Sequence, residues 1–198
     1  MKKMNLPNRL TVIRILLVPF IMAAILIKFP FHDMVAGLLF GAAAITDLFD
    51  GKIARRDNLI TDFGKFADPL ADKILVISVL VCFTAIGRCG AVPLCIIIFR
   101  EFAVTSVRLV AASNGKVIAA NMWGKVKTVS QIIAIVAIFV LQLIRDLLAL
   151  IPISEAALAA IGGTFNIIGH VLIWITAGFT IVSGAKYLID NKEIINDM

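Results

Sequence analysis

The sequence predicts an all-α, polytopic membrane protein with six transmembrane helices and both termini in the cytoplasm. Three observations predict this fold: the composition, the spacing of the charged residues and the distribution of Lys and Arg. Of the 198 residues, 61% are hydrophobic and 16% are charged, and the mean hydropathy is +1.01. Soluble domains contain roughly 45–50% apolar and about 25% charged residues. A soluble fold of this size cannot bury so much apolar surface, and the length fits one domain, residues 1–198.

Charged residues divide the chain into apolar runs, and these runs define the helices. A transmembrane helix needs about 20 residues, so most runs are long enough only when the helices extend past their charged ends. The first helix follows Pro7 and Asn8, and no small-residue cleavage site of a signal peptide comes after it. The expected helices span residues 9–28, 35–55, 70–88, 91–113, 124–146 and 164–188.

Particular residues fix the later boundaries. Pro69 suits the first turn of the third helix, because its missing N–H costs nothing there. The fourth helix continues the apolar run 89–99 and carries Arg100 and Arg108 inside it. The last helix lies within the uncharged run 156–185, and we expect residues 154–165 to begin with a short interfacial helix.

The Lys and Arg residues gather on one side of this six-helix arrangement. Three lie on the opposite side (Lys28, Arg88 and Arg145), and three lie inside helices (Arg14, Arg100 and Arg108). The other 13 share the side of the termini: Lys2, Lys3, Arg9, Lys52, Arg55, Arg56, Lys65, Lys73, Lys116, Lys125, Lys127, Lys186 and Lys192. The positive-inside rule places that side in the cytoplasm. There the net charge of +6 meets anionic lipid and attracts phosphorylated substrates.

The cysteines and histidines of the chain do not indicate a metal site or a catalytic site. Cys82, Cys89 and Cys95 form no CxxC pair and lie in or beside apolar runs, so we expect small core residues. With only His32 and His170 in the chain, a zinc site or a Ser-His-Asp hydrolase is not expected. His170 is expected to be a satisfied polar packing residue.

Six aspartates cluster between the second and third predicted helices: Asp47, Asp50, Asp57, Asp62, Asp68 and Asp72. Asp47 and Asp50 have i, i+3 spacing, and Asp68 and Asp72 have i, i+4 spacing, so each pair projects from one helix face. The alternative is a solvated loop whose acids pair with nearby Lys and Arg. Asp57 and Asp62 fit that alternative, and the two spaced pairs do not.

Four carboxylates in a membrane-embedded pocket repel one another and lose hydration. Divalent cations resolve this conflict, and oxygen ligands without nearby His or Cys favour Mg²⁺, Mn²⁺ or Ca²⁺ over zinc. The small residues Gly51, Ala54 and Gly64 lie among the acids and allow a phosphorylated ligand to approach the backbone closely.

These residues form a spaced signature. Asp47-Leu-Phe-Asp50-Gly51-Lys-Ile-Ala54-Arg55, eight residues and then Gly64-Lys-Phe-Ala-Asp68-Pro-Leu-Ala-Asp72 match D-x2-D-G-x2-A-R-x8-G-x3-D-x3-D at every fixed position. The pattern resembles the signature of the CDP-alcohol phosphotransferase family. That family transfers a phosphatidyl or similar phospho-group from a CDP-linked donor to an alcohol and releases CMP.

The resemblance implies roles residue by residue. Asp47, Asp50, Asp68 and Asp72 would hold one or two divalent ions, Mg²⁺ or Mn²⁺, and Asp72 would also be the catalytic base. The residues around the cytidine and phosphates of the donor would be Asp47, Asp50, Gly51, Ala54, Arg55 and Gly64. It further implies a homodimer in the cytoplasmic membrane, with the active site facing the cytoplasm.

Looser motifs concern the acceptor. Asn5 to Arg14, Arg100-Glu101-Phe102 with Arg108, and Gly124 to Thr128 resemble the members that make phosphatidylglycerophosphate. They imply CDP-diacylglycerol as donor and glycerol 3-phosphate as acceptor, in contact with membrane lipid and with no nucleic acid. Cations at helix ends suit an acceptor phosphate, and the candidates are Arg14, Arg108, Lys125 and Lys127. Beside Glu101, Arg100 is expected to form a structural pair.

Three alternatives stay open at this point. A sister transferase of the same family, of the cardiolipin or phosphatidylserine synthase type, would use the same metal site with another acceptor. A cation transporter would line an ion path with the same aspartates, although these acids cluster near one face only. A scaffold without activity is the third alternative.

Overall fold

The structure is a computed structural model and describes residues 5–56, 62–113 and 122–192; side chains are described there except at 6–7, 47–56, 62–66 and 113. The regular structure in these ranges is entirely α-helical. The six helices are α1 (Leu6–Leu26), α2 (His32–Arg56), α3 (Asp62–Ala85), α4 (Ala91–Ser113), α5 (Met122–Leu148) and α6 (Glu155–Asp190). The all-α prediction is confirmed, and α4 has the predicted bounds.

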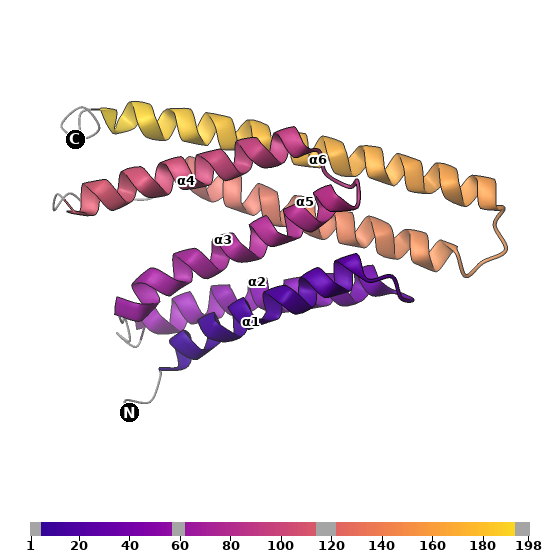
Figure 1. Cartoon of the computed structure of the whole chain (residues 1–198), viewed down its shortest axis with the longest axis horizontal. Helices are drawn as coiled ribbons and strands as arrows, with labels where there is room; N and C mark the ends of the chain where they lie inside the picture. Colours follow the sequence, from indigo (N-terminus) through magenta and orange to yellow (C-terminus); the bar gives the residue numbers. More distant parts are fainter. Residues whose placement is uncertain (1–4, 57–61, 114–121, 193–198) are drawn as a thin grey trace.

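The helices run alternately up and down along one long axis (Figure 1). Helix α1 packs against α2 and α3, and α6 packs against α4 and α5. Contacts of α2 with α5 and of α3 with α4 join these two groups. We call the end where α1 begins and α6 ends the site end, and the end with the α1–α2, α3–α4 and α5–α6 connections the distal end (Figure 1). Helix α1 therefore begins, and helix α6 ends, at the same end of the bundle (Figure 1).

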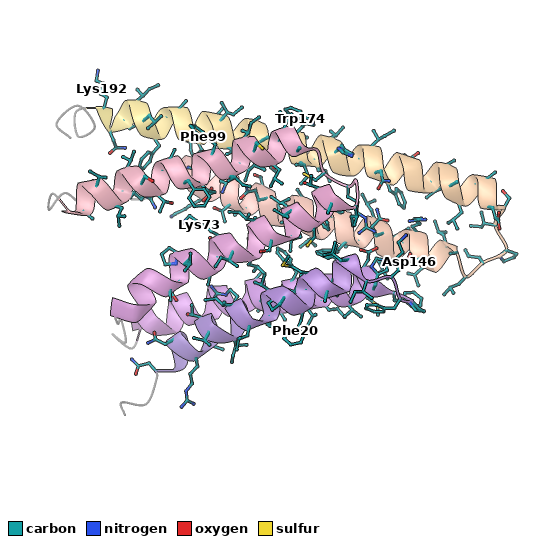
Figure 2. All side chains as sticks on the ribbon, viewed as in Figure 1. Phe20, Lys73, Phe99, Asp146, Trp174 and Lys192 are labelled. Carbon is teal, nitrogen blue, oxygen red and sulfur yellow. The ribbon has the colours of Figure 1, made fainter. Side chains whose placement is uncertain are left out.

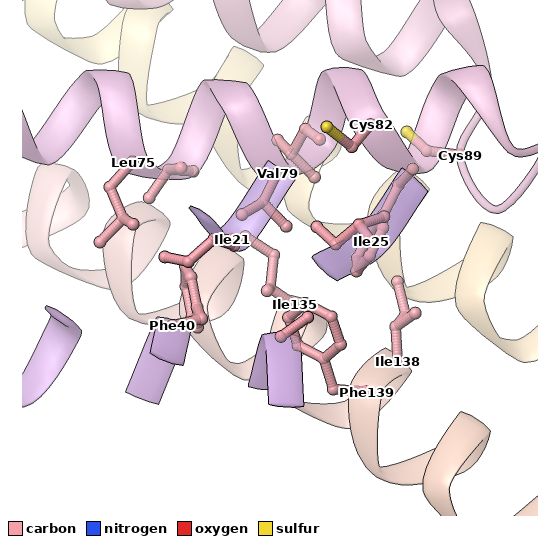
Figure 3. Packing of buried hydrophobic residues seen from close by; sticks show 14 of the residues in the cluster. Ile21, Ile25, Phe40, Leu75, Val79, Cys82, Cys89, Ile135, Ile138 and Phe139 are labelled. Carbon is pink, nitrogen blue, oxygen red and sulfur yellow. The ribbon is translucent and has the colours of Figure 1, made fainter. Parts of the chain in front are cut away.

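The core lies where α1, α2, α3 and α5 meet. Ile21 of α1, Phe40 of α2 and Phe83 of α3 are fully buried in one hydrophobic cluster with Phe139 of α5. Figure 3 shows Ile21, Phe40 and Phe139 in this cluster. The rings of Phe83 and Phe139 meet edge to face with centroids 5.2 Å apart. Because lipid is as apolar as these side chains, close packing rather than escape from water holds such helices together.

The outer surface is strongly apolar. Phe20 and Phe99 are 65% and 78% exposed (Figure 2). Within the described ranges, three helices are long and apolar enough to cross a membrane: residues Asn8–Leu26 of α1, α5 and α6. The described side chains of α3 include three charged ones, Asp68, Asp72 and Lys73, and those of α4 include Arg100, Glu101 and Arg108. These charges keep α3 and α4 out of that group, and they gather at the candidate site.

The distal end is closed by polar contacts. Asp33 of α2 is buried and forms a bidentate pair with Arg88, whose Nη2 donates to Asp33 Oδ2 at 2.7 Å. Nε2 of His170 lies 3.1 Å from the carbonyl oxygen of Gly87, which adopts a positive φ of 76° in the α3–α4 turn. The expectation of a satisfied packing role for His170 is confirmed.

Helix α6 corrects one prediction. The prediction of a short interfacial helix within 154–165 is wrong, because one unbroken helix runs from Glu155 to Asp190. Ser154 begins it by accepting a hydrogen bond from the N–H of Ala157 at 3.3 Å. Gly162 does not break the helix; a Cβ there would lie 3.2 Å from Nε of Arg145. This glycine makes room for a neighbouring side chain.

Helix α3 begins earlier than expected. It starts at Asp62, so Pro69 lies inside the helix rather than in its first turn. Asp62 is therefore a helical residue and not a loop residue, and Asp57 lies outside the described residues. Pro69 has no N–H for the carbonyl four residues before it. The helix nevertheless continues through Pro69 without that hydrogen bond.

Two of the three cysteines are core residues. Cys82 and Cys89 are buried, and burial raises the pKa of the Cys89 thiol, which keeps it protonated and unreactive. Cys95 is exposed on α4, so the expectation of a core position is wrong for this residue. It lines an apolar groove between α4 and α6.

Candidate functional site

A cavity of about 500 Å³ lies near the site end, between α3, α4, α5 and α6. Carboxylates and cations from α3, α4 and α5 line it, and α6 contributes Tyr187. Its polar lining among the described residues includes Asp72, Arg100, Glu101, Arg108, Lys125 and Tyr187. The cavity thus brings together a predicted catalytic base and two of the predicted acceptor cations.

Asp68 and Asp72 occupy one face of α3, one helical turn apart. Both are half-buried. The hydroxyl of Thr11 on α1 donates a hydrogen bond to Oδ1 of Asp68 at 2.5 Å, whereas Asp72 lines the cavity. The i, i+4 spacing therefore places Asp68 at the contact between α1 and α3 and Asp72 at the cavity.

The remaining predicted ligands and donor contacts lie in helical segments at the same end. Asp47, Asp50, Gly51, Ala54 and Arg55 belong to the last turns of α2, and Gly64 to the first turn of α3, but their side chains are outside the described set. Helices α2 and α3 contact each other and are joined by residues 57–61. Among the described side chains, no three of the His, Cys, Asp and Glu type come together.

The available oxygens fit a hard divalent cation. Asp68 and Asp72 supply carboxylates, Thr11 supplies a hydroxyl beside Asp68, and none of the described cysteines or histidines lines the cavity. Mg²⁺ and Mn²⁺ favour oxygen ligands of this kind. The helical spacing of Asp47 and Asp50 would add two more carboxylates from α2.

Glu101 is the centre of a charged network between α4, α5 and α6. Its Oε1 accepts from the ammonium of Lys127 and from Nη1 of Arg100, the latter at 3.3 Å. Nη2 of Arg100 donates to the hydroxyl of Ser183 at 2.7 Å. A Cβ at Gly184 would lie only 3.0 Å from Cγ of Arg100, so glycine makes room for this arginine. The expected Arg100–Glu101 pair is confirmed.

The four predicted acceptor cations divide into two groups. Arg108 and Lys125 are exposed to the cavity, from α4 and α5. Lys127 is buried against Glu101. Arg14 is fully buried in α1, one turn beyond Thr11, and is not among the residues that line the cavity.

Sequence reasoning missed one residue that lines the cavity, Tyr187, and one that contacts a lining residue, Ser183. Tyr187 of α6 is buried, and its ring centroid lies 5.5 Å from Cζ of Arg108. Ser183 holds Arg100 in place. The sequence did contain a signal for Tyr187, because it is the only tyrosine of the chain and interrupts an apolar helix near its charged end.

A helical bundle with an apolar exterior and a charged cavity at one end is typical of a membrane protein that binds a polar ligand. Residues 4–182 match the family model of CDP-alcohol phosphatidyltransferase. The chain belongs to this family.

Similar proteins cover between 66% and 96% of the chain. A CDP-diacylglycerol–glycerol-3-phosphate 3-phosphatidyltransferase of Bacillus subtilis (strain 168) is 39% identical over 203 residues, covering 96% of this chain and 97% of the relative. A protein of the same name from Rickettsia bellii is 34% identical, covering 92% and 93%. One from Salmonella choleraesuis is 41% identical over 135 residues, covering 66% and 74%.

Proposed function

We propose that this chain transfers the phosphatidyl group of CDP-diacylglycerol to glycerol 3-phosphate, giving phosphatidylglycerophosphate and CMP. One observation carries the proposal: Asp72, Arg108 and Lys125 line the same cavity of about 500 Å³. A carboxylate that takes a proton and cations that hold a phosphate thus border one space. The names of the relatives supply the same pair of substrates.

The acceptor is held through its phosphate. Arg108 and Lys125 come from different helices and are both exposed to the cavity, so they meet a phosphate from two directions. Lys127 and Arg14 complete the predicted set of cations from buried positions. We assign direct contact to the first two residues and charge balance to the other two.

Asp72 acts as the base. It takes the proton of the primary hydroxyl of glycerol 3-phosphate, and the hydroxyl oxygen forms a bond with the lipid phosphorus of the donor. The bond from that phosphorus to the bridging oxygen breaks, and CMP leaves with this oxygen. The position of Asp72 on the cavity wall gives it access to the acceptor.

The donor side uses the family signature. Asp47, Asp50, Asp68 and Asp72 hold one or two Mg²⁺ or Mn²⁺ ions, and Asp47, Asp50, Gly51, Ala54, Arg55 and Gly64 surround the CDP group. When bound, the metal neutralises the pyrophosphate and the charge on the departing CMP. The hydrogen bond from Thr11 fixes the orientation of Asp68 for this task.

The protein lies in the cytoplasmic membrane with six transmembrane helices. Its termini and the site end face the cytoplasm, where the positive charge is concentrated. The charged residues of α3 and α4 then border an aqueous cavity rather than lipid. We extend the proposal to a homodimer, as implied by the family resemblance.

An acceptor panel tests this function. The purified protein, in detergent with Mg²⁺ and CDP-diacylglycerol, receives glycerol 3-phosphate, glycerol, serine, inositol or phosphatidylglycerol, and CMP and the lipid product are measured. Efficient CMP release with glycerol 3-phosphate and poor release with glycerol are expected. A preference for an unphosphorylated alcohol would move the function to a sister transferase, and cation flux into liposomes without CMP release would indicate a transporter.

A further inference from the structure

Tyr187 carries a buried hydroxyl that nothing among the described residues satisfies. The residue lies near the end of α6 and is 1% exposed, and its Oη has no hydrogen-bond partner there. Leaving a buried hydroxyl unpaired costs free energy, because it lost its hydrogen bonds to water on folding. Phe would avoid this cost, so the hydroxyl requires an explanation.

The position of Tyr187 gives a reason for this hydroxyl. Tyr187 lines the cavity together with Asp72, Arg108 and Lys125. The guanidinium of Arg108 lies over its ring, with Cζ 5.5 Å from the centroid, within the range of a cation–π contact. The ring therefore supports the cation that we assign to the acceptor phosphate, and Tyr187 belongs to the same wall.

We propose that Tyr187 is a specificity-determining residue of the acceptor subsite. Its hydroxyl donates a hydrogen bond to an oxygen of the acceptor phosphate, and its ring orients Arg108 toward that phosphate. This inference rests on the proposed function and adds α6 to the acceptor site.

The chemistry favours a phosphate over other ligands. A phosphate offers three strong acceptor oxygens, and each oxygen accepts more than one hydrogen bond, so a neutral donor can join the two cations. A tyrosine hydroxyl is an uncharged hydrogen-bond donor. It therefore donates a hydrogen bond without adding charge to a cavity that already holds Arg100, Arg108 and Lys125.

Tyr187→Phe isolates the hydroxyl, because the ring under Arg108 remains. We expect the KM for glycerol 3-phosphate to rise about tenfold, equivalent to about 1.4 kcal/mol. The KM for CDP-diacylglycerol should change less than twofold, and the Tm should be unchanged or higher. Tyr187→Leu removes the ring as well and should raise the acceptor KM further. Thr180→Val is the control, because it deletes a buried hydroxyl of α6 that bonds to a backbone carbonyl.

The outcomes separate the possibilities. An unchanged acceptor KM in Tyr187→Phe overturns the inference, even if Tyr187→Leu is impaired or fails to fold. A rise in the KM for CDP-diacylglycerol instead of glycerol 3-phosphate also overturns it, since the hydroxyl would then serve the lipid phosphate. If the wild type does not use glycerol 3-phosphate at all, the proposed function fails before Tyr187 is tested. Calorimetric titration of glycerol 3-phosphate without donor should show the same tenfold loss of affinity.

Discussion

The ammonium of Lys127 on α5 donates to the carboxylate of Glu101 on α4, and both side chains are largely buried. Sequence alone placed Lys127 among the residues that bind the acceptor phosphate. In the structure its charge is already engaged, while Lys125, two residues earlier, is exposed to the cavity. Two lysines of one helix therefore differ in position: Lys127 joins two helices, and Lys125 faces the cavity.

Lys127→Met should destabilise the protein. Removing one partner of a buried ion pair leaves the other charge uncompensated and typically costs about 3–5 kcal/mol; the remaining contact of Glu101 with Arg100 reduces this loss. We expect a clear fall in the Tm, measured in detergent. Adding Glu101→Gln should restore part of it, and Lys125→Met is the matched control with a Tm near that of the wild type. Equal Tm values for Lys127→Met and the wild type would contradict the structural role.

Arg108→Ala and Lys125→Ala should weaken the binding of the acceptor. A charge-assisted contact to phosphate is worth about 1.5–3 kcal/mol, or about one to two decades in affinity. The KM for glycerol 3-phosphate should rise by that factor, measured by CMP release at saturating donor. The KM for CDP-diacylglycerol should change much less. Unchanged acceptor kinetics in both variants would remove this phosphate site.

Asp72→Asn should remove most of the activity. The amide keeps the size of the side chain but cannot accept the proton, and loss of a general base typically costs about 10²–10⁴-fold in rate. Asp57→Asn and Asp62→Asn should remain near the wild type, because these aspartates stand outside the two spaced pairs. Rates of CMP release under saturating substrates compare the three variants. Equal damage from Asp62→Asn would refute this division of the aspartates.

Removal of divalent metal should abolish turnover. Four carboxylates of α2 and α3 are proposed to share Mg²⁺ or Mn²⁺, and EDTA competes for these ions. Activity should return on adding either ion in excess. Full turnover by thoroughly stripped enzyme would disprove the proposed role of the four carboxylates.

Local patterns predicted the helices well, because each helix must satisfy its own backbone hydrogen bonds in lipid. The bounds of α4 agree residue by residue with the prediction, and the spacing of Asp68 and Asp72 placed both on one face. The early start of α3 was missed because its packing and continuing hydrogen bonds outweigh the bond that Pro69 cannot form.

Contacts between distant helices were beyond the sequence patterns. Arg100 and Ser183 are 83 positions apart and meet only because α4 packs against α6. The same packing brings Tyr187 under Arg108. Spacing along one helix carries no information about the rotation of another helix against it. For that reason the sequence predicted the cations of the proposed acceptor site but gave no such prediction for Tyr187.

In the proposed reaction, the hydroxyl of glycerol 3-phosphate attacks the lipid phosphorus of CDP-diacylglycerol. Glycerol 3-phosphate carrying ¹⁸O in its primary hydroxyl reveals this attack when both products are analysed by mass spectrometry. All of the label should appear in phosphatidylglycerophosphate and none in CMP. Label in CMP, or a lipid product without label, would contradict it.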